Sequence, residues 1–445
     1  MKIANKIAFA LLFCSPFLQS CLFQEEDIFD KPASQRLDEA AAILRETLQS
    51  SEDGWKLTYY TDPEQYGAYN FLFKFENGEV VAQGDSLFPQ GKFTSKWEIN
   101  KSQGGIVLDF SSYNDVFTDI ADPGKYIAGQ GLSGDIEFIW KRYSADKDTI
   151  YLQAKKNGAK IQLIKFHGNW DTYIDNINDV MDKFANGAMN RYFKVIDFAD
   201  GTSLVLGAYH KITRRFDQIF INDNDSLKVI ENGLAFHENG IEFYEPVTVK
   251  GKTITGLTYD RGTGTFSVEN GTVTAGIPPF VMPGDFTQLF QREDSYYFTH
   301  LSQSLMQEYY RIDSLMTTAK SLPNINMKNI EFGDMSLVMT SGSNATLIVY
   351  YRCEIDGETR WGQAASTPII VRKNINGRAD AFRFSNNGAS AVTGDYATLL
   401  KPSMDKFRNA ITQSGRDYIA VPDEYFEYIR FGSQFDGTFF GIKKE

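Results

Sequence analysis

Residues 69–81, "YNFLFKFENGEVV", predict a β-hairpin and with it the fold of this part of the chain. Tyr69, Phe71, Phe73 and Phe75 recur at every second position, which places their rings on one face of an extended strand. The pair Asn77-Gly78 then supplies the two residues that most readily adopt the left-handed conformations of a tight hairpin turn. We therefore expect antiparallel strands here.

Similar short alternating runs continue on both sides of this hairpin. They are "GWKLTYY" (54–60), "KFTSKWEIN" (92–100), "GIVLDF" (105–110), "GDIEFIWKRY" (134–143), "DTIYLQAKKNG" (148–158) and "KIQLIKF" (160–166). Consecutive hairpins favour an antiparallel meander, and a meander of about eight strands commonly closes into a barrel that has no free edges. The order of a helix, Gly54-Trp55 and a meander is lipocalin-like, although lipocalins carry one residue between the Gly and the Trp. We expect a lipocalin-like barrel in the N-terminal part.

The rest of the chain alternates helical stretches with short strand runs. A helix is expected from about Ser34, with Ser34 as its N-cap, and a second from Trp170, with Asp171 as its N-cap. "GIPPFVMPGDF" (276–286) is rich in proline and predicts a linker. The fold class is therefore mainly β with a few helices (α+β), built of antiparallel meanders. The predicted organisation is a signal peptide (1–20), a lipidated acidic tether (21–33), a helix plus antiparallel β domain (34–168), a helix plus second β region (169–283) and a C-terminal helix/β region (284–445).

The N-terminus predicts secretion and lipidation. Lys2 and Lys6 precede an apolar stretch at 7–18 that is too short to span a bilayer. Residues 18–21, "LQSC", have the form of a bacterial lipobox, with Gln19 in place of the usual small residue, so Cys21 is the predicted lipidation site. Acyl chains contribute about 0.8 kcal/mol per buried methylene, enough to hold a folded body on a membrane. The alternative is an ordinary signal peptide with an incidental cysteine.

Residues 24–27, "QEED", are acidic and resemble the export signal that sends lipoproteins of the Bacteroidota to the outer face of the outer membrane. The alternative is a solvated acidic linker. The whole chain has a formal net charge of -12, which becomes more negative when Lys2 and Lys6 are removed. Nucleic acid is therefore not expected as a partner.

No motif predicts catalysis or a cofactor. The histidines at 167, 210, 237 and 300 are too far apart for a His-x-x-x-His metal pair, and no Gly-x-Ser-x-Gly elbow or phosphate loop is present. Asp223 and Asp225 have the spacing of a calcium loop without its glycine and glutamate. Asp135 and Glu137 would share one strand face, as glycosidase carboxylates can. For Asp223 and Asp225 the more common alternative is a polar turn, and for Asp135 and Glu137 it is a chance pairing in an acidic chain. No catalytic residue, metal ligand or cofactor is therefore predicted.

Aromatic residues make up 14% of the chain and could line a glycan-binding surface, because sugar faces stack on aromatic rings. The candidate ligand-binding residues are Trp55, Tyr59, Trp97 and Trp170, with Trp361 as a further position. The alternative for each is an ordinary core residue.

The ordered segments "GWKLTYY", "GGIVLDFSSYNDVF", "GLSGDIEF", "TIYLQAKKNG" and "NGIEFYEPVTVKGKTITGLTYD" resemble the Bacteroidota lipoproteins of domain of unknown function 4302. The resemblance implies an outer-membrane lipoprotein, commonly encoded beside SusC/SusD-like nutrient importers. The family has no assigned reaction, so the resemblance implies no catalytic residue.

Three functional hypotheses follow. The leading one is a non-enzymatic lipoprotein at the cell surface that binds a nutrient polymer, a glycan or peptide, or supports a SusC/SusD-like TonB-dependent importer. The second is an extracellular glycan or peptide hydrolase. The third is a carrier of haem or metal.

Overall fold

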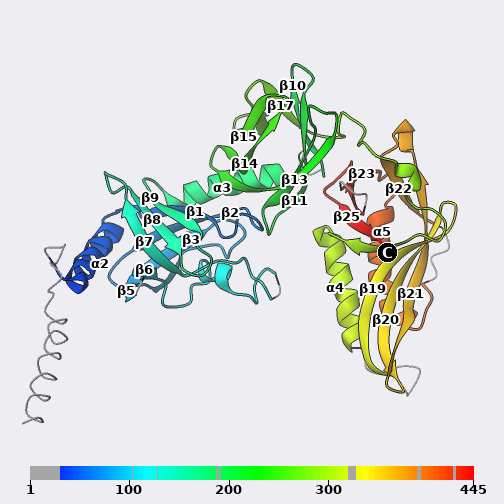
Figure 1. The fold of residues 1–445 in the computed structure, drawn as a ribbon, viewed down its shortest axis with the longest axis horizontal. Helices are drawn as coiled ribbons and strands as arrows, with labels where there is room; N and C mark the ends of the chain where they lie inside the picture. The colour runs from blue at the N-terminus through cyan, green and yellow to red at the C-terminus, as the bar shows by residue number, and fades with distance from the viewer. Residues whose placement is uncertain are drawn as a thin grey trace, which may run out of the picture.

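The chain folds into three β modules, which follow one another along the sequence (Figure 1). The computed structural model describes residues 31–445, except 103, 128, 187, 188, 190, 191, 319–326, 388–391 and 424–426. We call residues 33–165 the N-terminal module, 170–275 the middle module and 295–444 the C-terminal module. The prediction of a mainly β, antiparallel fold with a few helices is confirmed. The predicted signal peptide, Cys21 and the acidic stretch 24–27 lie outside the described residues.

The N-terminal module is one sheet that curls around on itself. Its elements are α2 (Ala33–Gln49), β1 (Trp55–Tyr60), β2 (Ala68–Phe75), β3 (Glu79–Gly84), β4 (Phe93–Lys96), β5 (Glu98–Ser102), β6 (Gly105–Asp109), η2 (Thr118–Ala121), β7 (Glu137–Tyr143), β8 (Thr149–Ala154) and β9 (Lys160–Lys165). The strand order is β4-β3-β2-β1-β9-β8-β7-β6-β5. Because only Trp97 separates the two outermost strands, β4 and β5, both edges of the sheet lie on one continuous segment. The module thus has the expected up-and-down order.

The interior of this sheet is filled by aromatic rings. Phe117, from the loop between β6 and β7, meets Phe71 edge-to-face at 5.2 Å and Phe73 at 4.9 Å between ring centroids. Phe110 and Phe138 complete the cluster. The barrel expected from the sequence is not closed in this module, because its nine strands are not paired between β4 and β5; the closed barrels are those of the other two modules. The likeness to a lipocalin is therefore limited to strand order, since the rings occupy the space where a lipocalin holds its ligand.

The middle module is a closed barrel packed against α3 (Figure 1). Its elements are α3 (Trp170–Ala185), β10 (Lys194–Phe198), β11 (Ser203–His210), β12 (Arg215–Ile221), β13 (Leu227–His237), β14 (Gly240–Val249), β15 (Lys252–Asp260), β16 (Thr265–Val268) and β17 (Gly271–Ala275). The apolar face of α3, from Ile174 to Phe184, joins the barrel residues in one core.

Both predicted N-caps are wrong. Asn169, not Asp171, caps α3 and accepts a hydrogen bond from the Thr172 amide. Asp171 instead pairs with Lys92 of the N-terminal module, Nζ to Oδ2 3.1 Å. Helix α2 begins at Ala33, before Ser34, and no side chain caps it. In each case the helix begins earlier than the residue that the sequence suggested as its cap.

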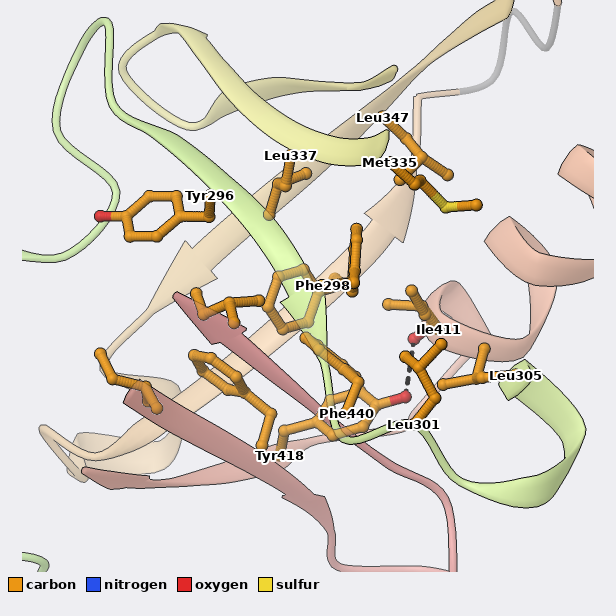
Figure 2. Close-up of a cluster of buried hydrophobic side chains, with 14 of the residues drawn as sticks. Tyr296, Phe298, Leu301, Leu305, Met335, Leu337, Leu347, Ile411, Tyr418 and Phe440 are labelled. Atoms are coloured by element: carbon orange, nitrogen blue, oxygen red, sulfur yellow. Dashed lines mark hydrogen bonds between the residues drawn. The ribbon is translucent and has the colours of Figure 1, made fainter. Parts of the chain in front are cut away.

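The C-terminal module is a second closed barrel. Its elements are β18 (Ser295–Thr299), α4 (Gln303–Thr318), β19 (Lys328–Ser341), β20 (Asn344–Ile355), β21 (Glu358–Lys373), η5 (Ile375–Gly377), β22 (Ala381–Asn386), α5 (Ala397–Thr412), β23 (Tyr418–Pro422), β24 (Tyr428–Ser433) and β25 (Phe439–Lys444), preceded by η4 (Phe286–Gln288). Figure 2 shows Leu305 of α4 and Ile411 of α5 packed with Phe298 and Phe440 of the strands. The Tyr418 hydroxyl donates to the carbonyl of Ile411 at 3.1 Å, which ties α5 to the sheet.

The modules are joined by buried polar contacts. Arg214 of the middle module and Asp85 of the N-terminal module form a bidentate ion pair in which both side chains are fully buried. Gly67 lies so close to the middle module that a Cβ there would be 2.3 Å from the Arg214 carbonyl oxygen. Within the described residues, no helix has both the length and the apolar content needed to span a bilayer.

Candidate ligand-binding cleft

A cleft of about 650 Å³ lies between the middle and C-terminal modules. The residues that line it are Asp225, Ser226, Leu227, Lys228, Val229, Pro283, Gly284, Val421, Pro422, Asp423, Tyr428 and Arg430. The volume is within the range of small-molecule and oligomer sites, which favour the boundaries between domains. The lining combines aliphatic and proline surface with charges of both signs, a mixture that can pack against a ligand and also hydrogen-bond to it.

One wall is the turn between β12 and β13. The side chain of Asn222 closes this turn, because its Oδ1 accepts hydrogen bonds from the amides of Asn224 at 3.0 Å and Ser226 at 2.9 Å. Asp225, in a left-handed conformation at φ 55°, then reaches the cleft. The calcium-like spacing of Asp223 and Asp225 thus belongs to a polar turn, the alternative that the sequence also allowed.

The opposite wall is formed by the end of β23, with Asp423 after it, and by the start of β24. The Asp423 amide donates to the Tyr428 carbonyl at 2.9 Å, and Asp423 Oδ1 accepts from the Glu427 amide at 2.9 Å. These bonds hold Asp423 and Tyr428 side by side at the mouth of the hairpin. The outward face of β24 then presents Tyr428 and Arg430 to the cleft, while Ile429 and Phe431 turn into the core.

Arg430 joins the two modules at the cleft. Its Nη1 lies 2.6 Å from Asp217 Oδ2, and its Nη2 lies 3.3 Å from Glu231 Oε1. Burial raises the pKa of Asp217 to about 6, while the Arg430 charge lowers it. The arginine therefore has two acidic partners in the middle module, and this fixes one wall of the cleft against the other.

His210 is half-buried in the same junction. Its ring meets Phe439 edge-to-face at 5.1 Å, and burial lowers its pKa to about 4. The charged or titratable groups that influence it are His300, Glu231, Arg430 and Arg215. The imidazole is thus neutral in the folded protein at neutral pH.

We predict that His210 couples stability to pH. Above about pH 6.5 the imidazole is neutral in both states. Between pH 6.5 and 4 the unfolded chain binds a proton that the folded one does not, so up to about 3 kcal/mol of stability is lost. Asp217 acts in the opposite direction, because the folded state keeps its proton up to about pH 6, so acidification stabilises the fold through that group.

The difference between wild type and His210→Gln separates the two effects. Urea unfolding at pH 7.5 and pH 4.5 measures the free energy of unfolding of both proteins. Relative to wild type, the free energy of unfolding of His210→Gln should be about 2–3 kcal/mol higher at pH 4.5 than at pH 7.5. His237→Gln, at an exposed histidine, is the control. An unchanged difference between His210→Gln and wild type would contradict the assignment.

The four ligand-binding residues predicted from the sequence lie in cores. Trp55 and Tyr59 are fully buried, Trp97 is 2% exposed and Trp170 is 8% exposed. The indole nitrogens of Trp55, Trp97 and Trp170 donate to the carbonyls of Leu48, Glu76 and Asp53. These rings offer no open face to a ligand, and the structure does not gather them at the cleft. Trp361, by contrast, is 62% exposed.

The other polar candidates also have structural partners. Asp135 accepts hydrogen bonds from the amides of Ile136 and Glu137, and Glu137 pairs with Lys155 at 2.6 Å. Cys353 is buried in β20. In the described part of the chain, no three side chains of His, Cys, Asp or Glu are grouped so that they could hold a metal ion.

Sequence reasoning missed most of the cleft residues, although it singled out Asp225. Leu227 and Tyr428 are 201 positions apart, so no local motif joins them. One signal was present: in "EYIRF" the alternation places Tyr428 and Arg430 on the face opposite Ile429 and Phe431. This alternation alone places an aromatic ring and an arginine together on the outer face of the strand.

The strand orders define the class of protein: a mainly β chain of consecutive up-and-down meanders, with a ligand-sized cleft between the second and third modules. Residues 25–261, more than half of the chain, match the family described as "Domain of unknown function (DUF4302)". The chain belongs to that family. The match covers the N-terminal module and most of the middle module, and so includes the Asp225 wall of the cleft but not the Tyr428 wall. No curated protein matches the chain.

Proposed function

We propose that this protein is a non-enzymatic outer-membrane lipoprotein that faces the cell exterior and binds a nutrient polymer in the cleft between its middle and C-terminal modules. The observation that carries the proposal is the cleft itself, because it places the Tyr428 ring beside Asp423 and Arg430 in a space of about 650 Å³. A ring for stacking and charged groups for hydrogen bonding are what binding of an oligomeric ligand requires.

Binding to the chain with Cys21→Ser, which removes the predicted lipid site and leaves the three modules intact, tests this proposal. Calorimetric titration with starch, xylan, mannan and pectin oligosaccharides, and with casein peptides, should reveal at least one ligand. Tyr428→Ala and Asp423→Asn should each weaken its binding about tenfold, the loss of one good contact. Tyr310→Ala, at a tyrosine 61% exposed on α4 and outside the cleft, should bind normally. Failure of every ligand would overturn the proposal.

A hydrolase is the second candidate, and the carboxylates of Asp225 and Asp423 in the cleft favour it. Release of product from the same substrates, lost in both Asp225→Asn and Asp423→Asn, would establish it. Binding without product release supports the binding protein.

The proposed location at the cell surface and the proposed role beside an importer are based on the sequence. Lipidation at Cys21 predicts an acylated N-terminus in the native protein, which mass spectrometry would detect. Outward display predicts loss of the modules when intact cells are treated with protease. Co-purification of a SusC/SusD-like pair from outer membranes would support a role beside an importer.

A further inference from the structure

Trp361 lies on the outer face of the C-terminal barrel with most of its ring exposed to solvent. It is 62% exposed, and its ring covers the backbone of Gly333, where a Cβ would lie 2.4 Å from the ring edge. The glycine on β19 thus makes room for a tryptophan on β21. Burial is the usual place for so large an apolar side chain, so an exposed ring held against a backbone suits a surface with a partner.

Further aromatic residues share this outer face on neighbouring strands. Trp361 is paired with Arg352 of β20, and Tyr350 lies two positions from Arg352 on the same face. Tyr350 is paired with Asp334 of β19, and Tyr297 of β18 is paired with Ser336, two positions beyond Asp334.

The series ends at the cleft. Tyr297 is paired with Lys443 of β25, and the Lys443 ammonium lies 4.6 Å from the ring centroid of Tyr428, a cleft residue. We call Trp361, Tyr350, Tyr297 and Tyr428 the aromatic strip. It crosses the six neighbouring strands β21, β20, β19, β18, β25 and β24 of the closed barrel, an arc of roughly 24 Å around its outer face at the usual strand spacing.

Charged groups alternate with the rings along the strip. Arg352 pairs with Glu331 on β19, and Asp334 lies beside Tyr350. Glu445 accepts a hydrogen bond from the Ser336 hydroxyl at 3.0 Å, and Lys443 stands between two tyrosines. A membrane or a partner helix would require a continuous apolar patch. A sugar chain matches the alternation of aromatic and charged side chains, because each sugar ring presents an apolar C–H face for stacking and hydroxyl groups at its edge for hydrogen bonding.

We propose that the aromatic strip extends the cleft into a track for a polysaccharide chain, with the cleft holding a few sugar units and the strip the units that follow. The inference rests on the proposed binding function of the cleft and adds a ligand class and a length requirement.

Affinity as a function of chain length tests the track. The probes are a short oligosaccharide and its parent polysaccharide from starch, xylan, mannan and pectin, titrated into the chain with Cys21→Ser. At equal molar concentration of chains, the dissociation constant of the bound polysaccharide should be about tenfold lower than that of its short oligosaccharide. Trp361→Ala should remove most of this gain and leave the oligosaccharide affinity unchanged, whereas Tyr428→Ala should weaken both. Tyr310→Ala is again the control.

Fluorescence provides a second readout. Of the five tryptophans, Trp361 is among the exposed large hydrophobic residues, whereas Trp55, Trp97 and Trp170 are buried. Binding of the polysaccharide should shift the fluorescence emission of the exposed Trp361 to shorter wavelength. Trp361→Phe should abolish this shift. Oligosaccharide binding with no length dependence and no effect of Trp361→Ala would overturn the track and leave the cleft standing. Binding of no glycan would overturn the track, and binding of casein peptides alone would keep only the cleft.

Discussion

Asp85→Ala is expected to lower the free energy of unfolding of the N-terminal and middle modules by about 3–5 kcal/mol, because it leaves a buried arginine without its counter-ion. Asp85 and Arg214 are each fully buried, and Arg214 Nη1 lies 2.8 Å from Asp85 Oδ2. Without Asp85 the guanidinium keeps the Ala68 carbonyl, at 2.6 Å, the Met181 sulfur, at 4.0 Å, and the faces of two aromatic rings, those of Tyr69 and Phe236. Asp85 also accepts from the Asn70 amide, so the change removes a backbone contact as well.

Urea unfolding followed by tryptophan fluorescence measures this loss, since Trp55, Trp97 and Trp170 all lie in or beside the N-terminal module. Glu79→Gln, which removes the exposed pair with Lys96, should change stability by less than about 1 kcal/mol. The double variant Asp85→Leu with Arg214→Met should recover much of the loss, because it removes both buried charges. A loss below about 1 kcal/mol in Asp85→Ala would contradict the pair's structural role.

Phe440→Ala is expected to destabilise the C-terminal module by about 3–5 kcal/mol through loss of buried area and formation of a cavity. The ring is fully buried at the centre of the cluster in Figure 2. Its centroid lies 5.2 Å from those of Phe384, Tyr418 and Phe431 and 5.7 Å from that of Phe298. Four aromatic contacts are lost together, and α5 loses packing because Tyr418 bonds to it.

Hydrogen exchange localises this effect to β18–β25 and α5. The matched control is Phe435→Ala, since Phe435 is 58% exposed in the preceding loop and should contribute within about 0.5 kcal/mol. Equal losses in the two variants would show that the cluster is not the core of this module. Slower exchange in the C-terminal module of Phe440→Ala would contradict the prediction outright.

The local parts of the fold could be predicted because their signals are local. The hairpin of "YNFLFKFENGEVV" appears as β2 and β3, paired from Phe71 with Gly84 to Phe75 with Val80 around Asn77-Gly78. Alternation and turn chemistry act over a few residues, so they survive in the sequence. Exact caps are weaker signals, because several polar residues near a helix start compete, as Asn169 and Asp171 do.

The candidate site could not be predicted in the same way. Trp55, Tyr59, Trp97 and Trp170 are large aromatic residues suited equally to a core or to a sugar surface, and the sequence contains no signal that separates the two uses. Which face of a strand is covered depends on what packs against it. Trp361 is exposed because its strand turns that face outward over Gly333, and Trp55 is buried because α2 closes over it.

Antiparallel meanders with a few helices follow from the order of residues alone, because side-chain alternation, turn residues and helical periodicity are properties of neighbouring positions. The tertiary structure alone decided which rings became core, that Arg214 and Asp85 would join two modules, and that β13 and β24 would enclose a cleft. The physical reason is distance along the chain. The Arg214–Asp85 pair and the two walls of the cleft bring together residues more than a hundred positions apart, whose approach depends on the packing of whole modules.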